Sequence, residues 1–162
     1  MKSIVLIGFA TAGKTTSGQI VANKLGLPFL DTDVLLQQTY GATVNALLSL
    51  GKDRFRALEN DLIKILPLND AVISCGGGLV LNDNFYKLTD CTVVWLKVSA
   101  SQCLKRLGNV RRPLHDGKSQ TELQAMLDCR NNVYSKVAQV VIDTDKKTPT
   151  QVANEIASIV GL

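Results

Sequence analysis

A glycine-rich segment near the start of the chain, GFATAGKT at residues 8–15, constrains the fold more than any other stretch. It matches the pattern G-x-x-x-x-G-K-[ST], in which glycines let the backbone curl around a phosphate with its N–H groups exposed. A short apolar run at residues 3–7 precedes it and a helical pattern follows it. This order is typical of a phosphate-binding P-loop. The alternative is a glycine-containing turn between a strand and a helix that binds nothing.

The pattern assigns a role to the polar residues of this loop. Lys14 would reach the β- and γ-phosphates of a nucleotide, and the Thr15 hydroxyl would hold Mg²⁺. The helix that begins near Lys14 would add its unpaired N–H groups and its positive dipole end. The sequence therefore predicts that a nucleotide binds through Gly8, Ala10, Thr11, Ala12, Gly13, Lys14, Thr15 and Thr16.

Short apolar runs alternate with amphipathic stretches along the rest of the chain. The expected helices have apolar faces made of Ile20, Val21 and Leu25, of Phe55, Leu58, Leu62 and Leu66, and of Val152, Ile156 and Ile159. Nearly continuous apolar strands between helices are typical of a parallel sheet covered on both faces. We predict an α/β protein with a three-layer α/β/α P-loop NTPase fold and a five-stranded parallel sheet, with strands at residues 4–7, 28–30, 71–74, 92–96 and 139–142.

Length and composition favour a single domain, residues 1–162, that acts on a small molecule. No apolar run approaches the roughly 20 residues that span a bilayer, so we expect a cytoplasmic protein with no membrane partner. The net charge is +4, the basic residues are scattered and 5% of the residues are aromatic, which argues against a nucleic-acid partner. The four cysteines and one histidine lack the spacing of a zinc site.

Ligands of such sheets bind beyond the carboxyl ends of the strands, so the residues that follow the strands are candidates. Asp31 and Asp33 follow the second strand. One could face a metal and the other a substrate hydroxyl, or one could cap the next helix. Gly76, Gly77 and Gly78 follow the third strand. This run indicates a ligand close to the main chain, a positive φ, or a loose turn.

Three further groups of charged residues remain open to two interpretations each. Arg56 and Glu59 form either a solvated surface pair or an arginine oriented for a substrate carboxylate. Residues 107–118 are polar, basic and bounded by glycine, which suits a mobile lid with Arg112 over the transferring phosphate, or an exposed loop. Arg130, four residues before Tyr134, faces either the cleft or solvent.

Taken together, these motifs resemble those of the shikimate kinase family. The motifs occur in the order typical of the family, at residues 8–15, 31–33, 55–56 and 59, 76–78, 112–114, and 130 and 134. The resemblance implies transfer of the γ-phosphoryl group of ATP to the 3-hydroxyl of shikimate, on the route to chorismate and the aromatic amino acids. The cofactors implied are ATP, as co-substrate, and Mg²⁺. We expect a monomer, which is the ordinary state of such kinases.

The resemblance also implies the roles of individual residues. Lys14, Asp33 and Arg112 would be catalytic, with Asp33 orienting the attacking oxygen or accepting its proton. Asp31, through its water shell, and Thr15 would hold the metal. Arg106, Arg112 and Pro149 would complete the nucleotide site. A helical segment at about residues 32–60 would contribute to the substrate site, whose residues would be Asp33, Arg56, Glu59, Gly76, Gly77, Gly78 and Arg130.

The sequence departs from the family pattern at Leu47, at Lys52 and at Thr11, which replaces a common small P-loop residue. Leu47 and Lys52 lie in the segment expected to close over shikimate, so we expect a weaker Michaelis constant for that acid. The alternatives are another small-molecule P-loop kinase, acting on gluconate or a nucleoside monophosphate, and a GTP-dependent switch protein. The switch protein is disfavoured because D-x-x-G after the first helix and N-K-x-D are missing from the sequence.

Overall fold

The computed structural model describes residues 1–108 and 119–161. Its central sheet is parallel, with the strand order β2-β3-β1-β4-β5. The strands are β1 (Ile4–Ile7), β2 (Phe29–Asp31), β3 (Val72–Ser74), β4 (Thr92–Lys97) and β5 (Val140–Asp143). Each end lies within one residue of its predicted position. The predicted three-layer fold and five-stranded parallel sheet are confirmed.

The α-helices of the described chain are α1 (Lys14–Leu25), α2 (Thr32–Tyr40), α3 (Val44–Leu48), α4 (Lys52–Ile63), α5 (Ala100–Leu107), α6 (Gln120–Val137) and α7 (Pro149–Ile159). Two 3₁₀ helices, η1 (Leu79–Leu81) and η2 (Asp83–Asp90), follow β3. Several helices begin where a side-chain oxygen accepts a hydrogen bond from the first turn, as Ser99 does for α5 and Thr148 for α7. These caps fix where each helix begins.

The sheet separates two apolar clusters, as the alternation of side chains along a strand requires. Along β1, Ile4 and Leu6 pack into the cluster that contains residues of α1 and α7. Val5 and Ile7 pack into the opposite cluster, which contains residues of α2, α4 and both 3₁₀ helices. Residues that alternate along one buried strand therefore connect the sheet to both helical layers.

Two details of the predicted helical faces were wrong. Ile159 is 46% exposed, although Val152 and Ile156 of the same helix are buried. Ile159 is the last residue of α7, and the next residue, Val160, packs against the core in its place. Leu66 is buried as expected but lies beyond the end of α4 at Ile63.

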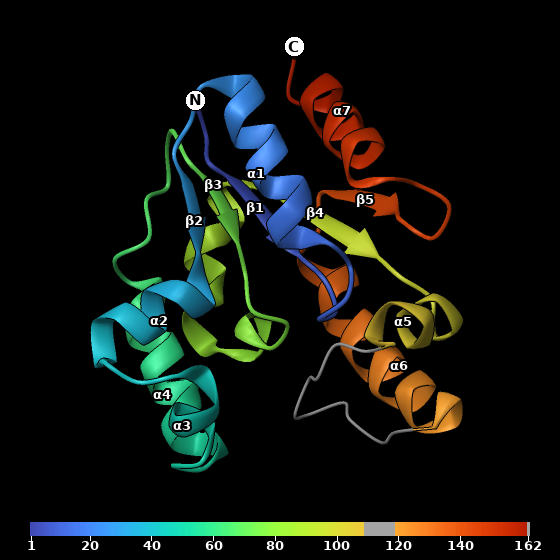
Figure 1. The fold of residues 1–162 in the computed structure, drawn as a ribbon. Helices are drawn as coiled ribbons and strands as arrows, with labels where there is room; N and C mark the ends of the chain where they lie inside the picture. Colours follow the sequence, from blue (N-terminus) through green and yellow to red (C-terminus); the bar gives the residue numbers. More distant parts are fainter. Residues whose placement is uncertain (109–118, 162) are drawn as a thin grey trace.

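The strand order places the loop between β1 and α1 at the middle of the sheet. Figure 1 shows α2, α3 and α4 gathered on one side of this loop and α5 and α6 on the other. Within residues 1–108 and 119–161, none of the helices has the length and hydropathy that a membrane span requires.

Candidate active site

The loop that follows β1 forms the geometry expected of a phosphate cradle. Gly13 has a φ of 83° and stands immediately before α1, so the backbone turns into the helix through a conformation that favours glycine. The first N–H groups of α1 then face the loop, where they can bind an anion.

The Lys14 side chain is folded into this loop. Its ammonium donates hydrogen bonds to the carbonyl oxygens of Gly8, at 2.7 Å, and Phe9, at 2.8 Å. Lys14 is 7% exposed. A compact positive charge therefore lies inside the loop, where a phosphate chain would lie.

Asp31 connects this loop to the second strand. The Thr15 hydroxyl donates a hydrogen bond to Asp31 Oδ2, at 2.9 Å. Asp31 Oδ1 accepts hydrogen bonds from the backbone N–H groups of Asp33, at 2.9 Å, and Val34, at 3.2 Å. Asp31 thus caps α2 with one oxygen, as one of its interpretations predicts, and accepts the Thr15 hydrogen bond with the other; its metal-facing role stays a prediction.

A cavity of about 240 Å³ lies at this edge of the sheet. It brings the P-loop together with the residues that follow β2 and β3. Its lining residues are Ala10, Thr11, Gly13, Lys14, Thr15, Thr16, Asp31, Asp33, Ser74, Cys75, Gly76, Gly77 and Arg106.

The glycine turn after β3 is closely approached by two charged side chains. A Cβ at Gly76 would stand 2.7 Å from Asp33 Oδ1, and a Cβ at Gly78 would overlap the Arg56 guanidinium. The Gly76 N–H donates a hydrogen bond to the Thr32 hydroxyl, at 2.8 Å. This turn is therefore held against α2, and its glycines leave space for a carboxylate and a guanidinium.

Arg56 is oriented by a buried partner. Its Nη1 forms an ion pair with Glu59 Oε1, and Glu59 is 1% exposed. The same oxygen accepts a hydrogen bond from Asn82 Nδ2, at 3.2 Å. Because Glu59 is buried, the interpretation of Arg56 and Glu59 as a solvated surface pair is wrong. Asn82 was not predicted, because a lone asparagine after η1 carries no sequence pattern.

Arg130 reaches the same turn from α6. Its Nη1 donates a hydrogen bond to the Gly77 carbonyl at 2.7 Å, and the Tyr134 hydroxyl donates to that oxygen at 2.6 Å. Tyr134 is fully buried and its ring lies 5.7 Å from that of Trp95. Burial raises the pKa of Tyr134 to about 12. Arg130 therefore faces the glycine turn and is not directed only to solvent.

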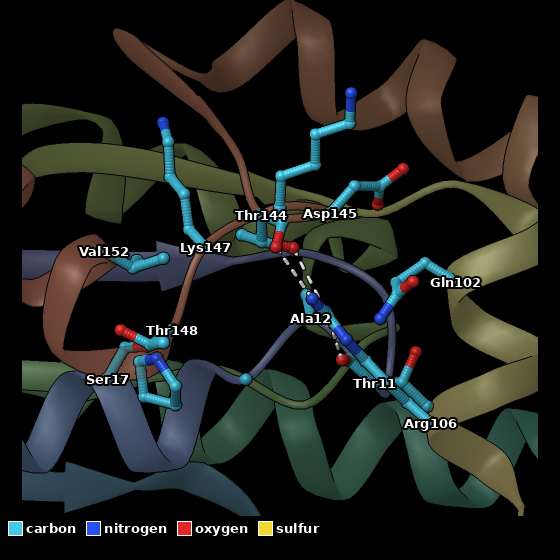
Figure 2. A pocket seen from close by; sticks show the side chains of 13 residues that line it. Thr11, Ala12, Ser17, Gln102, Arg106, Thr144, Asp145, Lys147, Thr148 and Val152 are labelled. Atoms are coloured by element: carbon cyan, nitrogen blue, oxygen red, sulfur yellow. Dashed lines mark hydrogen bonds between the residues drawn. The ribbon is translucent and has the colours of Figure 1, made fainter.

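A second cavity, of about 460 Å³, lies between the P-loop and the segment that joins β5 to α7. Arg106 and Pro149 both line it. Arg106 donates hydrogen bonds to the Thr11 carbonyl, at 2.9 Å, to Thr144 Oγ1, at 3.1 Å, and to the Thr144 carbonyl, at 2.8 Å (Figure 2). Arg106 thus connects two sides of this cavity. The buried Thr144 was not predicted, since it is a single threonine after a strand.

Comparisons with known proteins identify the family of this chain. The family model described as shikimate kinase matches residues 10–160. The chain belongs to the shikimate kinase family. A shikimate kinase of Enterococcus faecalis is 38% identical over 162 residues, covering 96% of each chain. One of Moorella thermoacetica is 39% identical over 159 residues, covering 95% of this chain and 91% of the relative.

A solved structure is similar over nearly the whole chain. It is that of a shikimate kinase from Acinetobacter baumannii in complex with shikimate, with a TM-score of 0.91 and 28% identity. The match covers 99% of this chain and 93% of the other. The resemblance to shikimate kinases stated from the sequence is thus confirmed.

Some residues assigned by the resemblance remain to be placed. Arg112 and most of the expected lid at 107–118 lie outside the described residues. Two residues at which this chain departs from the family pattern are described: Leu47, in α3, is buried in the apolar cluster that also contains residues of α2 and α4. Lys52 is exposed at the start of α4. The expected effect of both on the Michaelis constant stays a prediction.

Proposed function

We propose that this chain transfers the γ-phosphoryl group of ATP to the 3-hydroxyl of shikimate, giving 3-phosphoshikimate and ADP. The observation that carries this proposal is the approach of Asp33, Arg56 and Arg130 to one glycine turn at residues 76–78. The turn borders the cavity that Lys14 also lines. Membership of the shikimate kinase family supports the same reaction.

The nucleotide would occupy both cavities. Its phosphates would lie on the P-loop against Lys14 and the N–H groups at the start of α1. Its adenine would lie in the larger cavity, beside Arg106 and Pro149. Such an arrangement points the γ-phosphate toward Asp33 and the glycine turn, because the smaller cavity extends from the P-loop to these residues.

The Thr15 hydroxyl and Asp31 Oδ2 fit Mg²⁺. Both groups offer an oxygen atom as a metal ligand, the two oxygens lie 2.9 Å apart, and both residues line the smaller cavity. Magnesium in phosphoryl-transfer sites is bound by one or two protein oxygens together with water and phosphate, so a larger cluster of protein ligands is unnecessary. When bound, the ion would neutralise charge on the phosphate chain.

The acceptor would be held by its carboxylate and its hydroxyls. Arg56 and Arg130 offer planar guanidinium groups, which pair well with a carboxylate, and Glu59 orients the first of them. Asp33 would accept a hydrogen bond from the 3-hydroxyl and take its proton as the oxygen attacks. Phosphoryl transfer depends mainly on alignment and charge neutralisation, and these residues supply both.

Further features of the proposal rest on the sequence. Arg112 would stabilise charge on the transferring phosphoryl group. The chain, a single domain, would act as a cytoplasmic monomer on small molecules, with neither nucleic acid nor membrane as a partner. Light scattering after gel filtration tests the monomer: a mass of twice the 17.5 kDa of one chain would contradict it.

The decisive experiment measures ADP release from ATP and Mg²⁺ by the purified protein. The acceptors compared are shikimate, gluconate, a nucleoside monophosphate and none. We expect release with shikimate alone, and its loss when Mg²⁺ is chelated. Release with another acceptor but not with shikimate would reject the substrate while keeping the P-loop kinase, and GTP-dependent release without an acceptor would favour a switch protein.

A further inference from the structure

Asn82 connects two segments of the proposed acceptor site. It follows η1, which begins directly after the glycine turn, and it precedes η2. Its Nδ2 donates a hydrogen bond to Glu59 Oε1, at 3.2 Å, and another to the Leu79 carbonyl, at 3.0 Å. Glu59 lies on α4 together with Arg56. This amide therefore joins the helix that carries Arg56 to the segment that leaves the glycine turn.

The chemistry of its neighbours fixes the orientation of the Asn82 amide. The carboxylate and the carbonyl that it faces both accept hydrogen bonds, so the NH₂ group must point toward them. Asn82 is also the N-cap of η2, where an asparagine ordinarily accepts a hydrogen bond from the first turn. Within the part of the chain that the structure describes, its side chain forms no such bond. The amide is directed inward, toward α4, and does not cap the helix that follows it.

Burial separates the residue that can meet a ligand from those behind it. Asn82 is 7% exposed and Glu59 is 1% exposed, whereas the Arg56 side chain is 29% exposed. A buried carboxylate destabilises a protein unless polar or charged partners surround it. Arg56 and Asn82 supply such partners to the same oxygen of Glu59. Asn82 can therefore act on a ligand only through Glu59 and Arg56.

We propose that Asn82 is a positioning residue for acceptor binding: it holds the Glu59 carboxylate, which in turn orients the Arg56 guanidinium toward the acceptor carboxylate. A guanidinium pairs with a carboxylate in one plane through two parallel hydrogen bonds, so its orientation decides how well it binds. The guanidinium lies close against Gly78, where an added Cβ would overlap it. This inference rests on the proposed function, which supplies the acceptor carboxylate.

The first test is the steady-state kinetics of Asn82→Ala, with shikimate and ATP varied in turn. The Michaelis constant for shikimate should rise about five- to twentyfold, because the hydrogen bond that orients the Glu59–Arg56 pair is lost. The Michaelis constant for ATP should stay within about twofold and kcat within about threefold, since the P-loop and Asp33 keep their contacts. A general loss of folded protein would not raise one Michaelis constant alone.

Asn84→Ala is the matched control. Asn84 lies on η2 and also contacts α4, because its N–H donates to Asn60 Oδ1, at 3.0 Å, and its Nδ2 donates to the Asn60 carbonyl, at 3.2 Å. Both alanine variants should lower the melting temperature by about 2–4 °C. In Asn84→Ala, however, the Michaelis constant for shikimate should stay within about twofold of the wild-type value. An equal rise in both variants would show that Asn82 only secures η2 against α4.

A double-mutant cycle tests whether Asn82 acts through Arg56. In an Arg56→Ala background, Asn82→Ala should lower kcat/KM for shikimate by less than about twofold, because the guanidinium that it positions is absent. An equal fall in kcat/KM in the wild-type and Arg56→Ala backgrounds would overturn the proposal. An unchanged Michaelis constant for shikimate in Asn82→Ala would overturn it as well.

Asn82→Ser decides the question if Asn82→Ala fails to fold. Serine suits an N-cap position, but its hydroxyl lies one bond nearer to the main chain than Nδ2 does, so it does not replace the contact with Glu59. The Michaelis constant for shikimate should again rise, by about threefold or more. Wild-type protein is measured first. If shikimate does not stimulate ADP release, the proposed function fails together with this inference, whereas stimulation that is insensitive to Asn82 removes this inference alone.

Discussion

The Asp33 carboxylate lies against the backbone of Gly76 so closely that a Cβ added there would stand 2.7 Å from Asp33 Oδ1. No real Cβ contact is this short, so a side chain at position 76 forces a movement. The carboxylate is the end of a side chain, and it therefore moves more readily than the turn. Gly76 thus sets the position of the proposed catalytic carboxylate.

Replacing Gly76 by alanine should displace Asp33 and leave the nucleotide site intact. We expect kcat to fall about 10- to 100-fold, since a small misplacement of a catalytic group has effects of that size. The Kd for ADP should change less than about twofold, because the P-loop contacts remain. Gly77→Ala is the control, as its nearest contact would be an ordinary 3.7 Å. Equal losses of kcat in both variants would contradict this role of Gly76.

Gly78→Ala should act on the substrate-binding side, because the added Cβ would overlap the Arg56 guanidinium. The same guanidinium forms an ion pair with Glu59. We expect the Michaelis constant for shikimate to rise about tenfold or more, by the loss of a charge-assisted hydrogen bond, with that for ATP nearly unchanged. Steady-state kinetics with each substrate varied in turn measures both. An equal rise in the Michaelis constants for shikimate and for ATP would contradict the pairing of Arg56 with the acceptor carboxylate.

Asp33→Asn keeps the shape of the side chain and removes its ability to accept a proton. We expect nucleotide binding close to that of the wild type and turnover reduced about 10²- to 10⁴-fold, the usual contribution of a positioned base. Calorimetry with ADP and the coupled ADP-release assay provide the two values. Turnover at the wild-type rate would show that Asp33 takes no part in proton transfer.

Tyr134 should make stability depend on pH above 10. Burial raises its pKa from 10.0 to about 12, so the folded protein keeps a proton that the unfolded chain loses in this range. The associated stability is fully present below pH 10 and decreases as the pH rises toward 12, by about 1.4 kcal/mol at pH 11. Urea unfolding at pH 9, 10 and 11 measures it.

Tyr134→Phe is the control for this titration. At pH 7 it should be about 1 kcal/mol less stable, having lost the hydrogen bond to the Gly77 carbonyl. Near pH 11 the deficit should disappear, because the phenylalanine variant has no hydroxyl to titrate. A deficit that stays constant from pH 7 to 11 would contradict the raised pKa.

The cysteines should differ sharply in reactivity. Cys129 is exposed, whereas Cys75, Cys91 and Cys103 are buried. Burial also raises the pKa of the Cys75 thiol far above its usual range, so it stays protonated at pH 8. We expect iodoacetamide to label native protein at Cys129, and Cys129→Ser to abolish that labelling, as read by peptide mass spectrometry. Rapid labelling of Cys75 in the native protein would contradict this expectation and would show that the smaller cavity, which Cys75 lines, opens to solvent.

The fold was predictable because its apolar runs are short, buried and regularly interrupted, and the P-loop marks the first strand–helix junction. The end of an element was less predictable. Ile159 continues the helical spacing of Val152 and Ile156 but is exposed. Periodicity predicts which face of a helix is buried, but it does not predict where along the helix the packing against the rest of the protein ends.

The site was predictable where residues form a local pattern and not where a single residue acts across the fold. The spacing of Asp31 and Asp33 suggested a cap or a metal-facing carboxylate. That Asp31 does the first with one oxygen and reaches Thr15 with the other depends on two strands meeting at one sheet edge. Asn82 and Thr144 acquire their roles only through contacts with Glu59 and Arg106, which lie 23 and 38 residues away along the chain.

The strand order has a consequence for how far the effect of a substitution in this kinase can extend. The residues proposed to bind the acceptor, Asp33, Arg56, Glu59 and the glycine turn, come from one continuous stretch of chain around β2 and β3. Arg106 and Pro149, beside the larger cavity, come from segments after β4 and β5. Because β1 lies between β3 and β4, a substitution on the β2–β3 side can alter the proposed acceptor site while the residues beside the larger cavity keep their contacts. Arg130 is the exception. It extends from α6, which lies between β4 and β5 in the chain, and donates a hydrogen bond to the Gly77 carbonyl, so it connects the two halves.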